Sequence, residues 1–244
     1  MDLIEKKLIS NIEKKNKDKS SHWKKYLNKD SNFHNKILNF GFGSYTSKSY
    51  KDIFHRFLQK IIFGKKIFQT ETYLKYKKIF DLNNRLIDSD TIRHIFTFEK
   101  LKEIINPRII CIIGDGKLNG LIGAHLTFPK AKIFTVNLSE TLINDYIILK
   151  ELNIELKNSI ELVDNLEFRV SDKIVHLIPS NLKDFLLNKN IDLFINIASF
   201  QEMNVNEINR YFEIVKKNKS KIYCCNREYK KLVGNEELYF NKYP

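Results

Sequence analysis

Three small polar residues follow the most apolar stretch of the chain, where they could bind a ligand. The run Ile109–Ile113 is typical of a strand buried on both faces of a sheet, and Gly114, Asp115 and Gly116 follow it directly. Asn119 then precedes an apolar segment, 121–128, that fits a helix. Glycines let the backbone approach a ligand closely, and the free N–H groups of a helix start attract anionic or electron-rich groups. The pattern predicts a strand, a glycine turn and a helix start that cradle a ligand; a tight turn without a ligand is the alternative.

The end of the next predicted strand bears on which ligand is bound. Gly114, Gly116 and Gly120 have a spacing that also occurs in dinucleotide-binding proteins. A nicotinamide cofactor usually requires an acidic residue at the end of the second strand for its ribose, or an Arg for a 2′-phosphate. Here that strand ends at Asn137 and Leu138. An uncharged amide can bind a ribose hydroxyl, but its lack of charge disfavours NAD, and NADP more strongly.

Strand and helix patterns alternate beyond Pro107. The strand-like segments are 109–113, 132–138, 174–178, 191–198 and 221–225, and the helical segments are 121–128, 139–152, 182–187 and 204–218. Ser139 and Asn204 are expected to be helix N-caps, and Glu207 completes a capping-box pattern with Asn204. The polar stretch 154–173 is ambiguous and could be an insertion. Repeated units of this kind predict a parallel sheet covered by helices on both faces, with ligands at the carboxyl ends of the strands.

The first hundred residues have only helical patterns. The predicted helices include 70–79 and 90–105, with Asp90 as the cap of the latter; 41–44 is predicted to be a loop. A stripe at helical spacing is expected to lie in the core: Tyr50, Ile53, Phe54, Phe57, Leu58, Ile61 and Ile62. His55 and Arg56 fall off this stripe and face either solvent or substrate. The chain therefore divides into a helical region, 1–105, and an α/β domain, 106–244.

Charge and cysteine content limit the class of protein. The net charge is +13, of which residues 1–100 carry +11 and residues 101–244 carry +2. The basic N-terminal part either attracts an anionic partner, such as nucleic acid, a nucleotide-sugar or a membrane surface, or simply uses Lys as its solvated residue.

No apolar run approaches the roughly 18 residues of a membrane span, and the first ten residues do not resemble a signal peptide, so we expect a cytoplasmic protein. Cys111, Cys224 and Cys225 lack metal-site spacing and are predicted to be reduced core residues.

Four blocks carry a resemblance to a known family: C-I-I-G-D-G from residue 111, K-I-F-T-V-N-L-S-E from 132, I-D-L-F-I-N-I-A-S-F-Q-E-M-N from 191 and I-Y-C-C-N-R from 222. In order and spacing they resemble the sugar O-methyltransferases, a family of class I S-adenosylmethionine-dependent methyltransferases. The resemblance covers about residues 90–230. It implies a Rossmann-like fold and S-adenosylmethionine as the cofactor.

The resemblance also implies roles for individual residues. Gly114, Asp115 and Gly116 would wrap the methionine part of the cofactor and Asn137 would meet its ribose, while Asn196, Ile197 and Ala198 would line the methyl-donating face. Asn119 and Leu138 complete the predicted cofactor contacts. Two positions differ from the general class pattern: Leu118 stands in place of a third glycine, and Asn137 in place of an acidic residue.

Methyl transfer to a sugar hydroxyl requires positioning of the two reactants and removal of a proton. Glu202 follows the fourth predicted strand and is the candidate base, with helix-start placement as its alternative role. Gln201 is a candidate to orient the sugar, and Asn226 and Arg227 to bind an acceptor phosphate or hydroxyl. His176, inside a predicted strand, is expected to be a core histidine. We predict no metal site.

Other functions stay open at this point. The basic N-terminal part is compatible with an RNA-binding protein or an RNA methyltransferase, although no N-P-P-Y-like motif or aromatic stacking pattern supports nucleic acid. A domain that binds the cofactor without catalysis is a further alternative. Only residues 226–244 follow the fifth predicted strand, including a strand-like stretch at 237–240, so the sheet is expected to lack at least its last strand, as in a fragment or a shortened member.

Overall fold

The structure is a computed structural model that describes residues 2–14, 19–27, 50–152 and 155–243. The loop predicted at 41–44 lies outside these residues, as do the side chains of His55 and Arg56. The α-helices are α1 (Leu3–Lys14), α2 (Ser21–Leu27), α4 (Tyr50–Ile62), α5 (Glu71–Leu82), α6 (Ser89–Ile104), α7 (Asn119–Thr127), α8 (Ser139–Glu151) and α9 (Val205–Asn218). Short 3-10 helices are η1 (Lys65–Gln69), η2 (Glu155–Asn158), η3 (Ser180–Leu186), η4 (Phe200–Glu202) and η5 (Phe240–Lys242).

Six parallel strands form the central sheet. The strands are β1 (Ile109–Ile113), β2 (Lys132–Asn137), β3 (Ile160–Leu162), β4 (Val175–Pro179), β5 (Leu193–Ile197) and β6 (Lys221–Cys225), in the spatial order β3-β4-β2-β1-β5-β6. The chain runs from β1 toward one edge and then crosses over to β5 and the other edge. This reversal beside β1 is where a Rossmann-like sheet opens a crevice at its carboxyl ends. The α/β architecture with a parallel sheet is confirmed.

The sequence patterns located most of these elements within one or two residues, and the described part of 1–105 contains helices only. Two strands were not predicted: β3 lies in the polar stretch left as an insertion, and β7 (Tyr229–Lys231) pairs antiparallel with β8 (Glu237–Tyr239) in a separate hairpin. The segment predicted as a helix at 182–187 is the 3-10 helix η3.

Side chains of the sheet alternate between two hydrophobic clusters. Along β1, Ile110 and Ile112 pack on the face covered by α7 and α8, whereas Cys111 and Ile113 pack on the face covered by α9 and η3. This alternation is the period of a strand that is buried on both sides. The continuous apolar run of β1 therefore has the environment that the sequence predicted.

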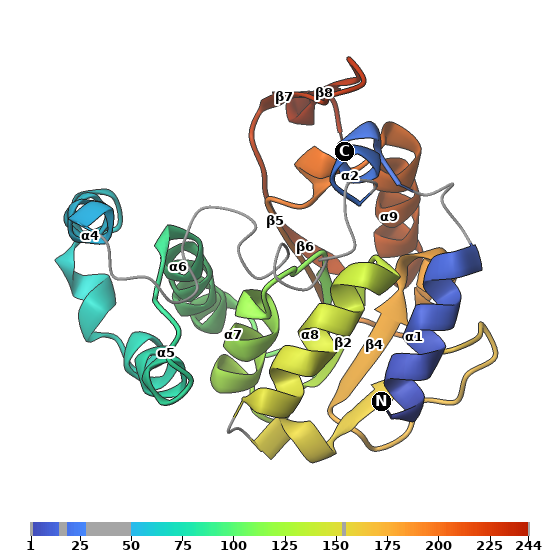
Figure 1. Cartoon of the computed structure of the whole chain (residues 1–244), viewed down its shortest axis with the longest axis horizontal. Coiled ribbons are helices and arrows are strands. Elements are labelled where there is room, and N and C mark those ends of the chain that lie inside the picture. The colour runs from blue at the N-terminus through green and yellow to red at the C-terminus, as the bar shows by residue number, and fades with distance from the viewer. Residues whose placement is uncertain (1, 15–18, 28–49, 153–154, 244) are drawn as a thin grey trace.

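The N-terminal helices join this core. Leu8 of α1 is fully buried where α1 packs along α8 (Figure 1), and Lys150 of α8 lies 3.0 Å from the carboxylates of both Asp2 and Glu5. On the other side of the sheet's helical layer, α5 and α6 pack against α7. Residues from α1, α5 and α6 belong to the same hydrophobic cluster as Ile110 of β1.

Gly123 lets α7 approach its two neighbours closely. A Cβ at this position would lie 2.2 Å from ring atoms of Phe98 in α6 and 2.4 Å from the hydroxyl of Tyr76 in α5. Both aromatic side chains are fully buried. The contact between the N-terminal helices and the α/β domain therefore depends on the absence of a side chain here.

The apolar stripe of α4 is not in the core, which corrects the prediction. Phe54, Phe57, Ile61 and Ile62 are each at least 60% exposed, Leu58 is half-buried, and the side chains of Tyr50 and Ile53 are not described. In Figure 1, α4 lies at the far end of the helical layer and contacts α6 through other positions, such as Gln59. Periodicity shows that a helix has an apolar face, but it does not show what covers that face.

The cysteines also differ in part from expectation. Cys111 is buried, but Cys224 is exposed and Cys225 is half-buried, because β6 is an edge strand of the sheet. All three are free thiols. Within the described part of the chain, no helix is long and apolar enough to cross a membrane.

Candidate functional site: a cavity at the carboxyl ends of the strands

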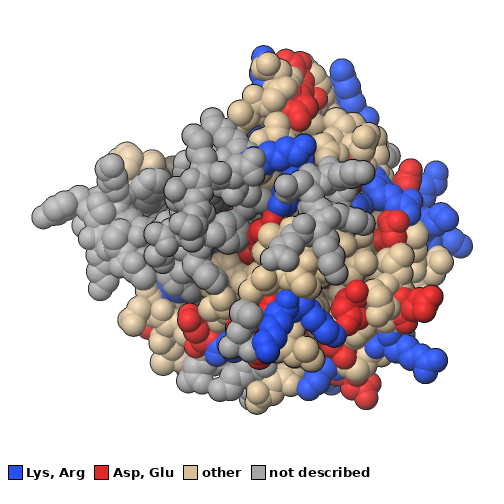
Figure 2. Space-filling view, turned by 45° about the vertical axis from the view of Figure 1, so that its right-hand side comes forward, with Lys and Arg blue, Asp and Glu red and all other residues tan. Residues whose placement is uncertain are grey.

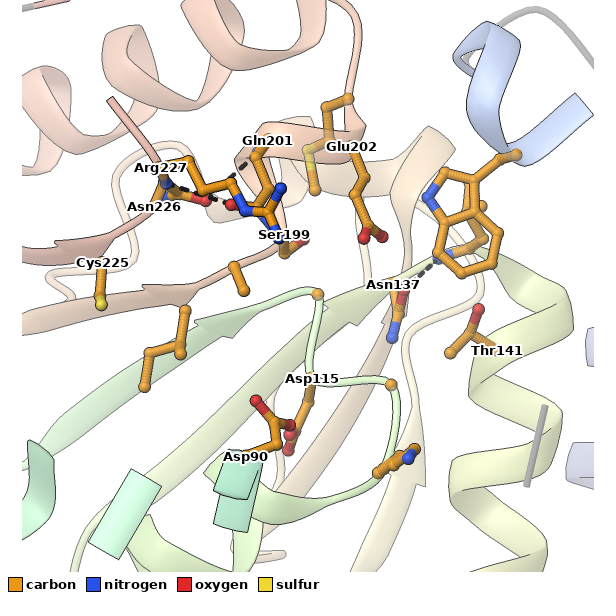
Figure 3. Close-up of a pocket in the computed structure, with 18 of the residues that line it drawn as sticks. Asp90, Asp115, Asn137, Thr141, Ser199, Gln201, Glu202, Cys225, Asn226 and Arg227 are labelled. Atoms are coloured by element: carbon orange, nitrogen blue, oxygen red, sulfur yellow. Dashed lines mark hydrogen bonds between the residues drawn. The ribbon is translucent and has the colours of Figure 1, made fainter. Parts of the chain in front are cut away.

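A cavity of about 570 Å³ opens at the carboxyl edge of the sheet. It is lined by the segments that follow β1, β2, β5 and β6, by the start of α6 and by residues of the N-terminal segment that leads into α2. Eleven of the sequence-predicted residues lie in its wall: Gly114, Asp115, Gly116, Asn137, Leu138, Ile197, Ala198, Gln201, Glu202, Asn226 and Arg227. All of the predicted site residues except Asn119 and Asn196 therefore converge on one cavity (Figure 3).

The turn after β1 is built by two glycines in the left-handed region. Gly114 has φ +73° and Gly116 has φ +66°, and a Cβ at Gly114 would lie only 1.8 Å from the Ser199 hydroxyl. Leu118, at the position where the class pattern has a third glycine, also adopts positive φ, +61°. The backbone at Leu118 thus has the conformation that glycine favours, and this conformation is strained for a bulky residue.

Asp115 occupies the start of α7, which corrects the expectation of free N–H groups. Its two carboxylate oxygens accept hydrogen bonds of 2.7 Å from the backbone N–H groups of Gly120 and Leu121. Burial raises the pKa of Asp115, whereas His94 and these two N–H donors oppose that shift. The anion-attracting end of the helix is therefore filled by the chain itself.

Asn119 does not line the cavity. It is fully buried, its side-chain oxygen accepts a hydrogen bond from Arg85, and its amide donates to Asp90 at 3.3 Å. Its backbone carbonyl accepts from the hydroxyl of Tyr76. The predicted cofactor role of Asn119 is thus replaced by a structural one, joining α7 to the N-terminal helices.

Asn196 is a second predicted cofactor residue that lies behind the wall. Its amide donates to the Ile113 carbonyl at 3.0 Å, and its side-chain oxygen accepts from the backbone N–H of Phe200 at 3.1 Å and the amide of Asn226 at 2.9 Å. These bonds tie the carboxyl ends of β1, β5 and β6 together. Two residues further along the chain, Ala198 lines the cavity and has φ +59°, an unusual conformation for a residue with a Cβ.

Asn137 is held in place by its neighbours. Its side-chain oxygen accepts from the backbone N–H of Leu138 at 3.0 Å, and its amide donates to Asp145 of α8 at 3.4 Å. Asp145 is fully buried, and burial raises its pKa well above the usual value. Beside Asn137, the buried hydroxyl of Thr141 lines the cavity and has no hydrogen-bond partner among the described residues.

Glu202 extends from the loop after β5 into the cavity, above Asp115 and Asn137 (Figure 3). Burial raises its pKa to about 7, although Lys230 and Arg227 act in the opposite direction. Its backbone carbonyl accepts from the hydroxyl of Ser20, and its carboxylate lies 3.8 Å from the His22 ring. A carboxyl group with a pKa near neutrality is suited to take or give a proton.

Gln201 and Asn226 fix the opposite wall. The Gln201 side-chain oxygen accepts from the backbone N–H of Arg227 at 3.1 Å, and the Asn226 side-chain oxygen accepts from the backbone N–H of Gln201 at 3.2 Å. Both residues line the cavity, but these oxygens hold the two loops together. The predicted sugar-orienting role would fall to the Gln201 amide.

Several wall residues were not predicted. Lys19, Ser20 and Trp23 come from the N-terminal segment, and Asp90, Arg93 and His94 come from α6. Only contacts distant in sequence bring these residues to the cavity.

Two helix caps differ from the prediction. The cap of α6 is Asp88 rather than Asp90, and that of α8 is Leu138 rather than Ser139. Asp90 instead pairs with Arg93; burial raises its pKa, but His94 and Arg93 bring it below the usual value.

His176 lies elsewhere, as predicted. It is fully buried in β4, its Nε2 lies 2.9 Å from the Lys173 carbonyl, and burial lowers its pKa. Asn204 caps α9 by accepting from the backbone N–H of Glu207 at 2.9 Å, also as predicted. No group of His, Cys, Asp and Glu in the described ranges has the arrangement of a metal site.

No protein-family model, curated protein or solved structure matches this chain. The fold and the cavity are therefore the basis for assigning a function.

Proposed function

We propose that this chain is an S-adenosylmethionine-dependent O-methyltransferase that methylates a hydroxyl of a sugar or glycan precursor. The observation that carries the proposal is the position of Asp115 at the start of α7. In dinucleotide-binding sites the pyrophosphate lies at this helix start, and here a carboxylate fills it. The cavity therefore suits a nucleoside cofactor that brings no phosphate to this point.

The wall residues fit the chemical groups of S-adenosylmethionine. The buried Thr141 hydroxyl, which lacks a partner among the described residues, and Asn137 would hold the ribose or base. Asp90 and Arg93 offer opposite charges for the amino and carboxylate groups of the methionine part. Gly116 leaves open space that a side chain would fill. When bound, the cofactor supplies an electrophilic methyl group.

Glu202 is the residue suited to remove the acceptor proton. As the acceptor oxygen gains the methyl group, it loses its proton to the Glu202 carboxylate, which a pKa of about 7 leaves partly ionised at neutral pH. A positioned base of this kind contributes about 10²–10⁴-fold to rate. Gln201 and Arg227 flank the same space and would orient the acceptor.

An RNA substrate has less support. In the described N-terminal region, Lys7, Lys19, Lys75 and Lys77 pair with acidic residues. Figure 2 shows Lys and Arg interspersed with Asp and Glu on the face it presents. A phosphate-binding platform requires a patch with one sign of charge, which these paired lysines do not provide.

The test is methyl transfer by the purified chain. The protein would be incubated with S-adenosylmethionine carrying a radiolabelled methyl group and, in separate reactions, with neutral sugars, sugar phosphates, nucleotide-sugars and a short RNA. We expect label in a sugar compound together with release of S-adenosylhomocysteine.

Two outcomes would overturn the proposal. Label in RNA alone would favour an RNA methyltransferase. Binding of S-adenosylmethionine by the folded chain without transfer to any sugar, sugar phosphate or nucleotide-sugar would favour a domain that binds the cofactor without catalysis.

A further inference from the structure

Two cationic side chains at the cavity form no ion pair with any described residue. Arg227 and Lys230 line the cavity near Glu202. The other Lys and Arg residues in the wall face carboxylates: Lys19 pairs with Glu140, Arg93 with Asp90, and Lys117 lies 4.0 Å from Asp88. Among the described wall residues, Arg227 and Lys230 are thus the Lys and Arg side chains outside an ion pair, and the carboxylate whose pKa they lower is that of the candidate base, Glu202.

The register of the C-terminal hairpin turns Lys230 inward. Lys230 of β7 lies opposite Leu238 of β8, and Lys231 lies opposite Glu237. Residues directly opposite each other in an antiparallel pair share one face. Because Leu238 is fully buried and Glu237 is exposed, Lys230 is on the inner face of the hairpin and Lys231 is on the outer face.

Arg227 stands on backbone that is held from two sides. Its backbone N–H donates to Gln201, and the preceding Asn226 donates through its amide to Asn196. The start of the Arg227 side chain is therefore fixed at the cavity, and its guanidinium can match a carboxylate or phosphate with two parallel hydrogen bonds.

We propose that Arg227 and Lys230 form an anion-binding subsite that holds a phosphate or carboxylate group of the acceptor beside Glu202. The acceptor would then be an acidic sugar, either a sugar phosphate or a uronic acid, rather than a neutral one. The identity of the ligand as a methyl acceptor rests on the proposed function; the affinity of the subsite for an anion does not.

The experiment is calorimetric titration of the full chain with glucose, glucose 1-phosphate and glucuronate, each with and without S-adenosylmethionine. At least one acidic sugar is expected to bind about tenfold or more tightly than glucose, in line with charge-assisted hydrogen bonds to two cations. Comparison of phosphate with carboxylate identifies the preferred anion.

Variants test whether these two residues are responsible. The double variant Arg227→Gln and Lys230→Gln is expected to lose about tenfold or more in affinity for the acidic sugar and to keep its affinity for S-adenosylmethionine. Lys231→Gln removes one positive charge from the outer face of the strand that carries Lys230 and is expected to change neither affinity. Circular dichroism of each variant checks that it is folded.

The subsite is overturned if glucose binds as tightly as both acidic sugars, or if the folded double variant binds them as the parent chain does. Tight binding of an acidic sugar by a chain that fails to bind S-adenosylmethionine would instead retain the subsite and reject the methyltransferase. Failure of the two proposals can therefore be told apart.

Discussion

Two carboxylates at the same edge of the sheet have opposite environments. Asp115 follows β1, and both of its oxygens accept backbone N–H groups at the start of α7. Glu202 follows β5, its carboxylate extends into the cavity, and burial raises its pKa to about 7. Both residues lie in connections that follow a strand, but the Asp115 carboxylate is bound to the backbone of the next helix, whereas the Glu202 carboxylate is directed into the cavity.

The difference shows how position within a turn decides the role of an acidic residue. The positive φ of Gly114 and Gly116 folds Asp115 back onto the helix that follows it, so its charge is stabilised by the helix start. Glu202 ends a 3-10 helix, η4, and the start of the following helix, α9, is capped by Asn204 instead. Asp115 is therefore expected to matter for stability, and Glu202 for chemistry.

The largest expected effect comes from Glu202→Gln. Removal of the base is expected to lower the rate of methyl transfer by about 100-fold or more, with little change in the affinity for S-adenosylmethionine. Rate and affinity would be measured by label incorporation and calorimetry. Glu213→Gln, on the exposed side of α9, is the matched control and should keep the parent rate. An equal loss of rate in both variants would contradict a specific role of Glu202 in proton removal.

Asp115→Asn is expected to lower the free energy of unfolding by about 1–3 kcal/mol, because an amide presents only one acceptor to two buried N–H donors. Urea denaturation followed by circular dichroism measures this change. Unchanged stability would show that the helix start does not need the carboxylate.

Gly123→Ala is expected to destabilise the fold by about 1–3 kcal/mol, because the new Cβ would overlap Phe98 and Tyr76. Thermal unfolding measures the loss. A melting temperature equal to that of the parent chain would mean that α5 and α6 do not pack on α7 as described.

The pH dependence of stability sharpens the contrast further. The pKa of Glu202 is raised from 4.5 to about 7 on folding, so this group's stabilisation of the fold is complete below about pH 4.5 and is lost as the pH rises through about 7. The stability of Glu202→Gln relative to the parent chain should therefore be greater at about pH 8 than at about pH 5. Melting temperatures at the two pH values test this; a difference independent of pH would contradict the raised pKa of Glu202.

The smallest effect is expected on α4. Phe54→Ser changes a side chain that is 60% exposed, and surface substitutions of this kind usually alter stability by less than about 0.5 kcal/mol. Urea denaturation measures it. A large loss would mean that this face is covered in solution.

The fold was largely predictable because its strands are apolar on both faces. Ile109–Ile113 has no polar residue to make it ambiguous, and its bounds match β1. Ile160–Leu162 is short, lies in a polar stretch and is only partly buried, so no local pattern distinguishes it from a loop. Its position as an edge strand depends on pairing with β4.

The candidate site was predictable only where it follows the strands. Gly114, Asn137 and Glu202 lie at carboxyl ends and were found by that rule. Asn119 was predicted to contact the cofactor because an Asn side chain can bind a ligand. The same side chain can make buried hydrogen bonds, as Asn119 does with Arg85 and Asp90. Trp23 reaches the cavity although it precedes Gly114 by 91 residues in the sequence, and no local pattern predicts such a contact.

The most direct test of the central claim is calorimetric titration of the purified chain with S-adenosylmethionine and, separately, with NADH. We expect micromolar binding of S-adenosylmethionine alone. We also expect loss of that binding in Gly116→Val, because φ +66° strains a β-branched residue at the cavity wall. A folded chain that fails to bind S-adenosylmethionine, or that binds NADH more tightly, would contradict the claim that Asp115 leaves a cavity for a cofactor without phosphate.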